Sequence, residues 1–192
     1  EAVRTAAFRC IMLCHALIEF LWCGAQLFLV DLFGVHGLSP SKVATAQAMG
    51  SVAAVVATVT AGLCIDRLSA HGKRWVLVAA TASGAAAALA LIYCTNMALA
   101  CAATALLGTM MGPLDVVFAT LYADSFGRKH LASILGLVST LSYIAIGASP
   151  VVYGAVRDRS GSFAPLLGSL VLLLPLAAAW IDLPVLASHG SP

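Results

Sequence analysis

The fold is decided by residues 75–114, WVLVAATASGAAAALALIYCTNMALACAATALLGTMMGPL, a run of forty residues without Asp, Glu, Lys or Arg. An α-helix needs about 20 apolar residues to cross the hydrocarbon core of a bilayer. The run is twice that length, and the more polar residues 93–96 (YCTN) interrupt it near its middle. It therefore predicts two membrane-spanning helices that are joined by a tight turn.

The rest of the chain has the same character. Of its 192 residues, 61% are hydrophobic and 9% are charged, and the mean hydropathy is +1.01, whereas ordinary globular domains carry about 25% charged residues. Further apolar stretches flank residues 75–114. We therefore expect an all-α, multi-pass integral membrane protein that contacts the lipid bilayer along most of its length. The six predicted transmembrane helices are at about residues 8–33, 41–65, 75–93, 97–121, 131–156 and 163–183.

The composition excludes several other classes. A net charge of +2 from ten scattered Lys and Arg residues does not supply the basic surface that nucleic-acid-binding proteins need. The six cysteines form no CxxC pair and lie mostly within or beside apolar spans, so we interpret them as small packing residues. No nucleophile motif, HExxH metal motif or cofactor-binding loop is recognisable. We predict that the protein is not an enzyme and that it uses no metal and no cofactor.

Positive residues in the loops indicate the orientation. If the N-terminus is cytoplasmic, the inner segments contain Arg4, Arg9, Arg67, Lys73, Arg74, Arg128 and Lys129, and the outer ones contain Lys42, Arg157 and Arg159. Short cytoplasmic loops carry an excess of Lys and Arg. Seven positive residues against three therefore predict that both ends of this segment are cytoplasmic.

Ionisable residues inside the predicted spans are the candidate functional residues. Glu19 lies about eleven residues into its helix, roughly 16 Å deep, near the centre of a core about 30 Å thick. A charge there is costly and marks a pathway by default, so we predict that Glu19 serves a proton or substrate path. His15 lies one turn away on the same face, and Gln26 lies close to the same stripe. The alternative is that Glu19 is a neutral, hydrogen-bonded core residue.

Asp115 is the second candidate. It lies about six residues from the predicted cytoplasmic end of its helix, roughly 9 Å from that end. At that depth it is either a gate residue or a side chain that reaches interfacial water.

An acidic residue, a glycine and a basic cluster follow three of the predicted helices. Such a group can cap a helix, turn the chain and pair charges between neighbouring helices. The cytoplasmic residues of this pattern are Gly62, Asp66, Arg67, Gly72, Lys73, Arg74, Asp124, Gly127 and Arg128, and the outer ones are Arg157, Asp158 and Gly161.

These motifs resemble the major facilitator superfamily of secondary transporters, and specifically its C-terminal six-helix half. Residues 62–74 are similar to the family's loop motif G-x-x-x-D-R-x-G-R-R, with residues 69–71 as an insertion. Residues 126–137 resemble its F-G-R-x-x-x-x-x-x-x-G-L segment, and residues 147–163 resemble its eleventh helix. The branch most similar to the chain is the monocarboxylate and oxalate:formate exchanger group, which also favours the G-L-S found at residues 37–39.

The resemblance implies a proton-coupled or exchange-type transporter that moves a small organic solute, such as a monocarboxylate, by alternating access. It implies that the chain is one half of a twelve-helix bundle in the plasma membrane. The partner is then the missing N-terminal half or a second copy, with the solute bound between the halves. Asp66 with Arg67, and Asp124 with Arg128, would form a cytoplasmic latch. Thr58 stands where this branch often carries an arginine for an anionic substrate.

Two other classes remain open. The first is a transport-inactive membrane half that serves as a sensor or scaffold, because the chain begins at Glu1 and is expected to be a fragment or a processed product. The second, more remote, is an integral-membrane enzyme that uses His15 and Glu19 as acid and base.

Overall fold

The computed structural model describes residues 5–127 and 131–188, with side chains at all of these except 6, 7, 70 and 177–188. In this part of the chain there are six α-helices and no strands, which confirms the prediction of an all-α protein with six helices. The helices are α1 (Ala6–Val35), α2 (Pro40–Ile65), α3 (Ala70–Ile92), α4 (Met97–Phe126), α5 (Leu131–Ser160) and α6 (Ala164–Ser188).

Five of the helices, α1 to α5, are long and apolar enough to cross a membrane. Their apolar segments contain between 22 and 30 residues, which exceeds the roughly 20 that a bilayer requires. The part of α6 whose side chains are described, Ala164–Leu176, is a shorter apolar helix.

Capping residues explain why some helices extend beyond their predicted ends. Helix α3 begins at Ala70 rather than at residue 75, because the hydroxyl of Ser69 accepts a hydrogen bond from the Gly72 amide at 3.2 Å and so caps the first turn. Helix α4 continues past residue 121 to Phe126 and ends at Gly127, whose φ of 75° is a conformation that glycine adopts without a steric penalty.

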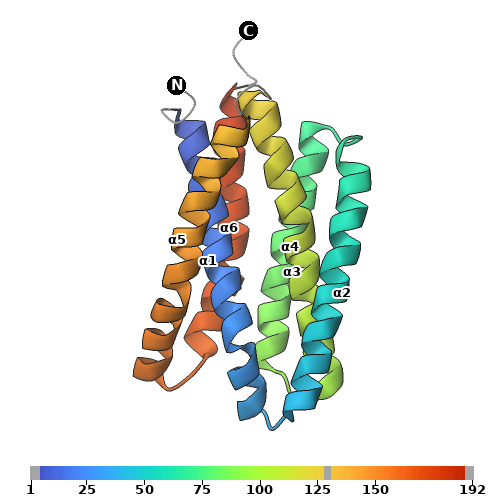
Figure 1. Ribbon diagram of the computed structural model, residues 1–192, viewed down its shortest axis with the longest axis vertical. Coiled ribbons are helices and arrows are strands. Elements are labelled where there is room, and N and C mark those ends of the chain that lie inside the picture. Colours follow the sequence, from blue (N-terminus) through green and yellow to red (C-terminus); the bar gives the residue numbers. More distant parts are fainter. Residues whose placement is uncertain (1–4, 128–130, 189–192) are drawn as a thin grey trace.

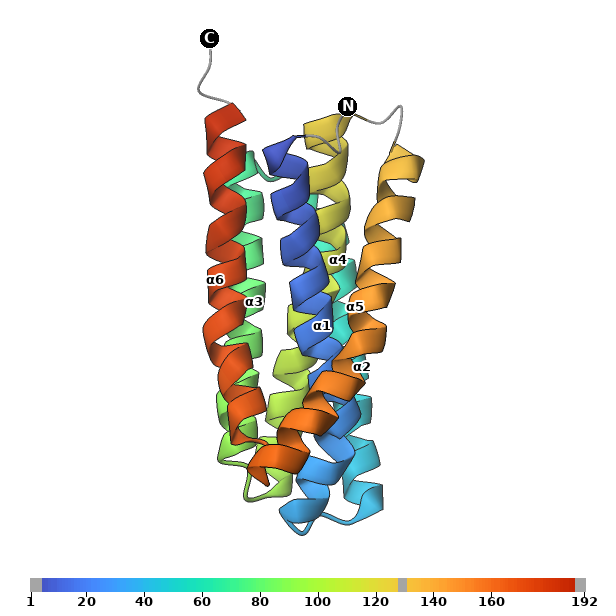
Figure 2. The ribbon, with the colours of Figure 1, turned by 90° about the vertical axis from the view of Figure 1, so that its left-hand side faces the viewer.

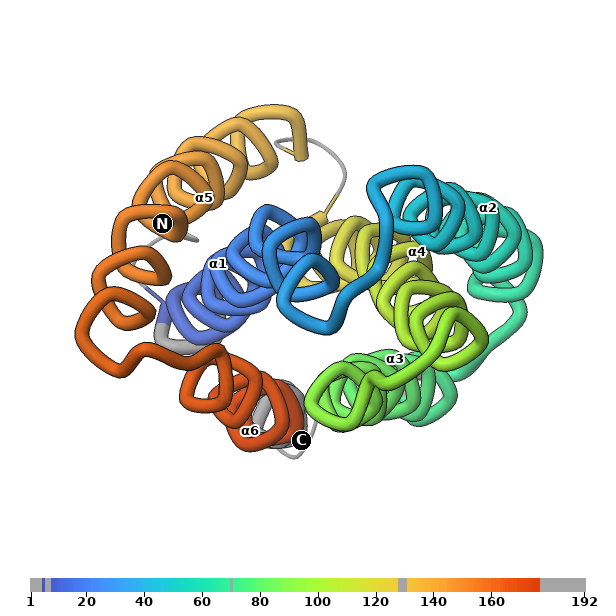
Figure 3. The backbone as a smooth tube through the Cα atoms, turned by 90° about the horizontal axis from the view of Figure 1, so that it is seen from below, coloured from blue at the N-terminus to red at the C-terminus, as the bar shows by residue number. Residues whose placement is uncertain are grey.

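The central helices of the bundle are α1 and α4 (Figure 3). Helices α3 and α6 lie on one side of this central pair, and α2 and α5 lie on the other. Helices α2 and α3 pack on α4, α5 and α6 pack on α1, and α3 packs on α6. All six run along the long axis of the molecule (Figures 1 and 2), and α1 begins at the same end of the bundle at which α6 finishes.

Helices α2 and α5 are the least covered helices of the bundle. In the most apolar stretch of 18 residues, only 11% of α2 and 17% of α5 is buried, whereas 50% of the corresponding stretch of α4 is buried. We call the side of the bundle that carries α2 and α5 the open face (Figure 3).

Aromatic side chains fill the space between α1 and α4. The ring of Phe8 lies against Tyr122 and Phe126, with centroids 6.2 and 5.3 Å away. Phe8 and Tyr122 are fully buried. Large aromatic rings therefore pack between the two central helices at this level.

Hydrogen bonds to main-chain carbonyls join neighbouring helices. Ser149 and Tyr153 of α5 donate to the carbonyls of Phe20 and Leu21 in α1, at 2.6 and 3.1 Å. Thr104 of α4 donates to a carbonyl of α2 at 2.6 Å. Because lipid supplies no hydrophobic force between helices, such bonds and close packing hold membrane bundles together.

Candidate functional site

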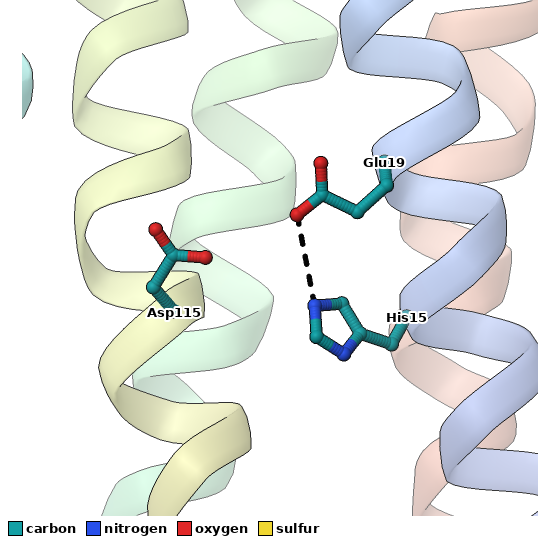
Figure 4. Close-up of side chains that lie close together, drawn as sticks. All are labelled: His15, Glu19 and Asp115. Carbon is teal, nitrogen blue, oxygen red and sulfur yellow. Dashed lines mark ion pairs between the residues drawn. The ribbon is translucent and has the colours of Figure 1, made fainter. Parts of the chain in front are cut away.

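Three ionisable side chains meet between α1 and α4 (Figure 4). His15 and Glu19 lie one turn apart on α1, with 3.6 Å between His15 Nε2 and Glu19 Oε1. Asp115 projects toward them from α4. One nitrogen or oxygen atom of each residue lies within 4.8 Å of those of the other two. We call these three residues the His-Glu-Asp cluster.

The cluster lies deep within the spans. Glu19 is 19 − 6 = 13 residues from the start of α1, and Asp115 is 126 − 115 = 11 residues from the end of α4. At 1.5 Å per residue these separations are roughly 20 and 16 Å. The sequence predicts that Asp115 lies only about 9 Å from the end of its helix. This distance is too small because α4 ends at Phe126 and not at residue 121. Asp115 is thus nearly as deep as Glu19.

The surroundings of the cluster are mostly aromatic. The ring of His15 stacks on Phe118 with 4.2 Å between centroids and 9° between planes, and Tyr122 lies 6.3 Å away. The side chains of His15 and Glu19 are 17% and 12% exposed, whereas Asp115 is exposed. Within the described part of the chain, His15 Nδ1 and the Tyr122 hydroxyl are buried and lack hydrogen-bond partners. Since buried polar atoms are nearly always paired, these atoms call for a ligand, water or another protein unit.

The cluster combines one imidazole with two carboxylates. Such groups carry protons through membrane proteins. Other titratable side chains near the three residues are Cys23 on α1 and Tyr122 on α4. The same three atoms are also close enough to share one cation. The arrangement is suited to holding and transferring a small positive species inside the membrane.

Gln26 does not join the cluster. It lies on another hollow, of about 220 Å³, formed by α1, α2 and α4 and also lined by Trp22, Gln47 and Ser51. We call this hollow the glutamine pocket. Gln47 is not among the predicted site residues, although it is an amide within an apolar span, which is the same signal that marks Gln26.

Thr58 lies outside both sites. It is exposed on α2, and its hydroxyl donates to the Ala54 carbonyl at 2.8 Å. Ala54 itself lines the glutamine pocket. Thr58 is therefore one helical turn from that pocket.

One ion pair joins residues of the predicted cytoplasmic loop motif from two helices. Lys73 Nζ of α3 lies 2.6 Å from Asp124 Oδ2 of α4. Asp66 and Arg67 follow α2, are exposed, and form no ion pair among the described residues. Arg128 lies outside the described residues, as do Arg4 and Lys129 of the predicted charge asymmetry. The observed ion pair thus joins the start of α3 to the end of α4.

Of the remaining motif residues, Gly62 lies near the end of α2, and Gly72 and Arg74 lie in the first turns of α3.

The predicted outer loop motif links α5 to α1, and to the residue that precedes α6, at the opposite end of the bundle. Arg157 of α5 pairs with Asp31 of α1 at 3.0 Å, and its guanidinium lies 4.8 Å from the centre of the Phe163 ring, just before α6. Asp158 is exposed, and Gly161, with a φ of 66°, turns the chain between α5 and α6.

Neither the comparison with protein-family models nor the comparison with curated proteins gave a match. The fold and the site define the class: a multi-pass α-helical membrane protein with a cluster of ionisable side chains between its two central helices. The resemblance to the major facilitator superfamily stays a prediction from the sequence motifs.

Proposed function

We propose that this chain is one six-helix half of a proton-coupled secondary transporter that moves a small organic solute by alternating access. The observation that supports the proposal most strongly is the His-Glu-Asp cluster between α1 and α4. Ionisable side chains within membrane spans are costly, and they mark ion and proton pathways by default. The loop motifs add support through their resemblance to a transporter family.

In the proposed mechanism, Glu19 accepts a proton that enters from one side of the membrane. His15, whose Nε2 is 3.6 Å from Glu19, passes the proton on, and Asp115 on the facing helix completes the path. Because the three groups belong to two helices, a small movement of α1 relative to α4 alters their separations. Proton transfer and helix movement are thereby coupled.

A second six-helix unit covers the open face in this proposal. Asp115 of α4 and Ser51 of α2 are exposed, and polar groups of this kind are unfavourable against lipid chains. In transporters built from two repeats, the solute lies near the bilayer midplane between them. We propose that the covering unit is an N-terminal half or a second copy of this chain.

The direct test is uptake by proteoliposomes that contain the full-length product of the gene. Labelled small carboxylates and uncharged solutes are added under an imposed pH gradient. We expect saturable uptake that collapses when the gradient is dissipated. A folded product that takes up none of these solutes would contradict the proposal and favour a sensor or scaffold.

Replacing Thr58 by arginine is expected to increase the affinity for small carboxylates about tenfold, because one charge-assisted hydrogen bond contributes roughly 1.5–3 kcal/mol. Thr58 is one turn from the pocket-lining Ala54, so an arginine there can reach a bound anion. The measurement is the KM for lactate uptake. Thr60→Arg is the control, since Thr60 lies in an apolar groove of α2, α3 and α4. An unchanged KM for every carboxylate in Thr58→Arg would count against the monocarboxylate branch.

A further inference from the structure

The glutamine pocket lies where α1, α2 and α4 meet, separate from the residues of the His-Glu-Asp cluster. Its volume of about 220 Å³ is below the roughly 300–1,000 Å³ of pockets for drug-sized ligands. The space therefore suits a solute of a few carbon atoms.

Both glutamines of the 192-residue chain line this one pocket. Gln26 belongs to α1 and Gln47 to α2, so only the packing of the helices brings them together. Among the residues that the structure describes, neither side-chain amide makes a hydrogen bond. Each amide offers two N–H donors and a carbonyl acceptor. The pocket thus presents unused hydrogen-bonding groups of both kinds.

The indole of Trp22 also lines the pocket. Its Nε1 is buried and finds no acceptor within the described part of the chain, and an indole N–H can only donate. The hydroxyl protons of the pocket are already used, because Ser51 donates to the main-chain carbonyl of Gln47 at 3.2 Å and Thr104 donates to the main-chain carbonyl of Ala46 at 2.6 Å. A ligand in this pocket must therefore match the donors and acceptors of the two glutamine amides.

Charge decides which solutes meet this requirement. The described residues that line the pocket include no acidic or basic side chain. A carboxylate bound there would lose its hydration without gaining a counter-ion, and burial of an unpaired charge is strongly unfavourable. A neutral amide or hydroxyl group can instead exchange its bonds to water for bonds to the side-chain amides of Gln26 and Gln47.

We infer that the glutamine pocket binds a small uncharged solute that carries carbonyl and hydroxyl or amide groups. The inference rests on the proposed function, since it names the class of solute that the transporter would carry. It differs from the monocarboxylate that the family resemblance implies, and the difference follows from the two glutamines and the uncharged lining.

Lactamide and lactate provide the matched probes, because they share one carbon skeleton and differ in whether the terminal group is an uncharged amide or a charged carboxylate. Binding is measured without transport, as the ligand-induced rise in the unfolding temperature of the full-length protein in detergent. We expect a saturable rise with lactamide, and at least about tenfold weaker binding of lactate because of its unpaired charge. This comparison needs no variant. Equal or tighter binding of lactate, or no rise with lactamide, would overturn the inference.

Variants test whether lactamide binds in the glutamine pocket. Gln26→Leu and Gln47→Leu are each expected to lose the rise with lactamide, and Thr60→Val, which removes a polar group of α2 outside the pocket, is expected to keep it. A rise that persists in both folded leucine variants would overturn the assignment to this pocket.

The two proposals fail in different ways. Lactamide binding without pH-driven uptake would contradict transport and leave the pocket assignment standing. Uptake driven by pH, together with preferential binding of lactate, would leave transport standing and overturn the uncharged class.

Discussion

Replacing Glu19 by glutamine is expected to abolish pH-driven uptake and to leave membrane insertion intact. Glutamine keeps the size of the side chain and one acceptor oxygen, but it cannot take up or release a proton in the working pH range. Since Glu19 lies 3.6 Å from His15 and faces Asp115, the substitution interrupts the proposed path at its centre. The measurement is initial uptake in proteoliposomes with and without a pH gradient.

Exchange of labelled for unlabelled solute, with no gradient, supplies the second readout for Glu19→Gln. Exchange requires solute binding and helix movement but no net proton transfer, so we expect it to continue. Asp31→Asn is the matched control, because Asp31 is an acidic residue of the same helix that lies outside the cluster and pairs with Arg157. Normal proton-coupled flux in Glu19→Gln would remove Glu19 from the mechanism.

Replacing Gly108 by alanine is expected to destabilise the protein by about 1–3 kcal/mol, the typical effect of overpacking. A Cβ atom at Gly108 would press on the carbonyl oxygen of Gly50 and lie 2.9 Å from the amide nitrogen of Ala54. Both atoms belong to the backbone of α2, so they cannot rotate away, and the whole helix has to shift. The measurement is the unfolding temperature of the protein in detergent.

Gly136→Ala is the control for Gly108→Ala. Gly136 is also inside a helix, but a Cβ atom there would have no other atom within 4 Å. Alanine is up to about 1 kcal/mol more favourable than glycine in a helix, so we expect a neutral or slightly stabilising effect. Equal losses of stability in the two variants would show that the close contact of α2 and α4 does not cause the destabilisation of Gly108→Ala.

The helices and their number could be predicted from the sequence with little ambiguity. Long runs without charge, such as residues 75–114, can be buried in a bilayer only as helices, because lipid offers no partners to backbone N–H and C=O groups. Local signals also mark several ends. Residues 39 and 40, Ser-Pro, predict the start of α2, which begins at Pro40. The end of α4 was predicted five residues too early, because the prediction followed hydropathy rather than the turn at Gly127.

The candidate site was only partly predictable. That His15 and Glu19 lie together follows from their spacing of four residues on one helix. That Asp115, 96 residues later in the chain than Glu19, meets them does not follow from any local pattern. The same holds for Gln47 opposite Gln26, and for the pairing of Lys73 with Asp124.

The sequence by itself therefore determined the class of protein, the six helices and which residues lie within one turn of each other, because chain geometry sets the neighbours of a residue along its own helix. The tertiary structure decided which helices are central and which faces of α1, α2 and α4 point toward one another. Helices that are apolar on all sides carry no stripe that marks an inward face. The rotation of each helix about its axis is set by side-chain packing and by close approach at small residues. Here Gly50 and Gly108 make the close approach, and the Thr104 hydroxyl adds a hydrogen bond between α4 and α2. This packing forms the His-Glu-Asp cluster and the glutamine pocket.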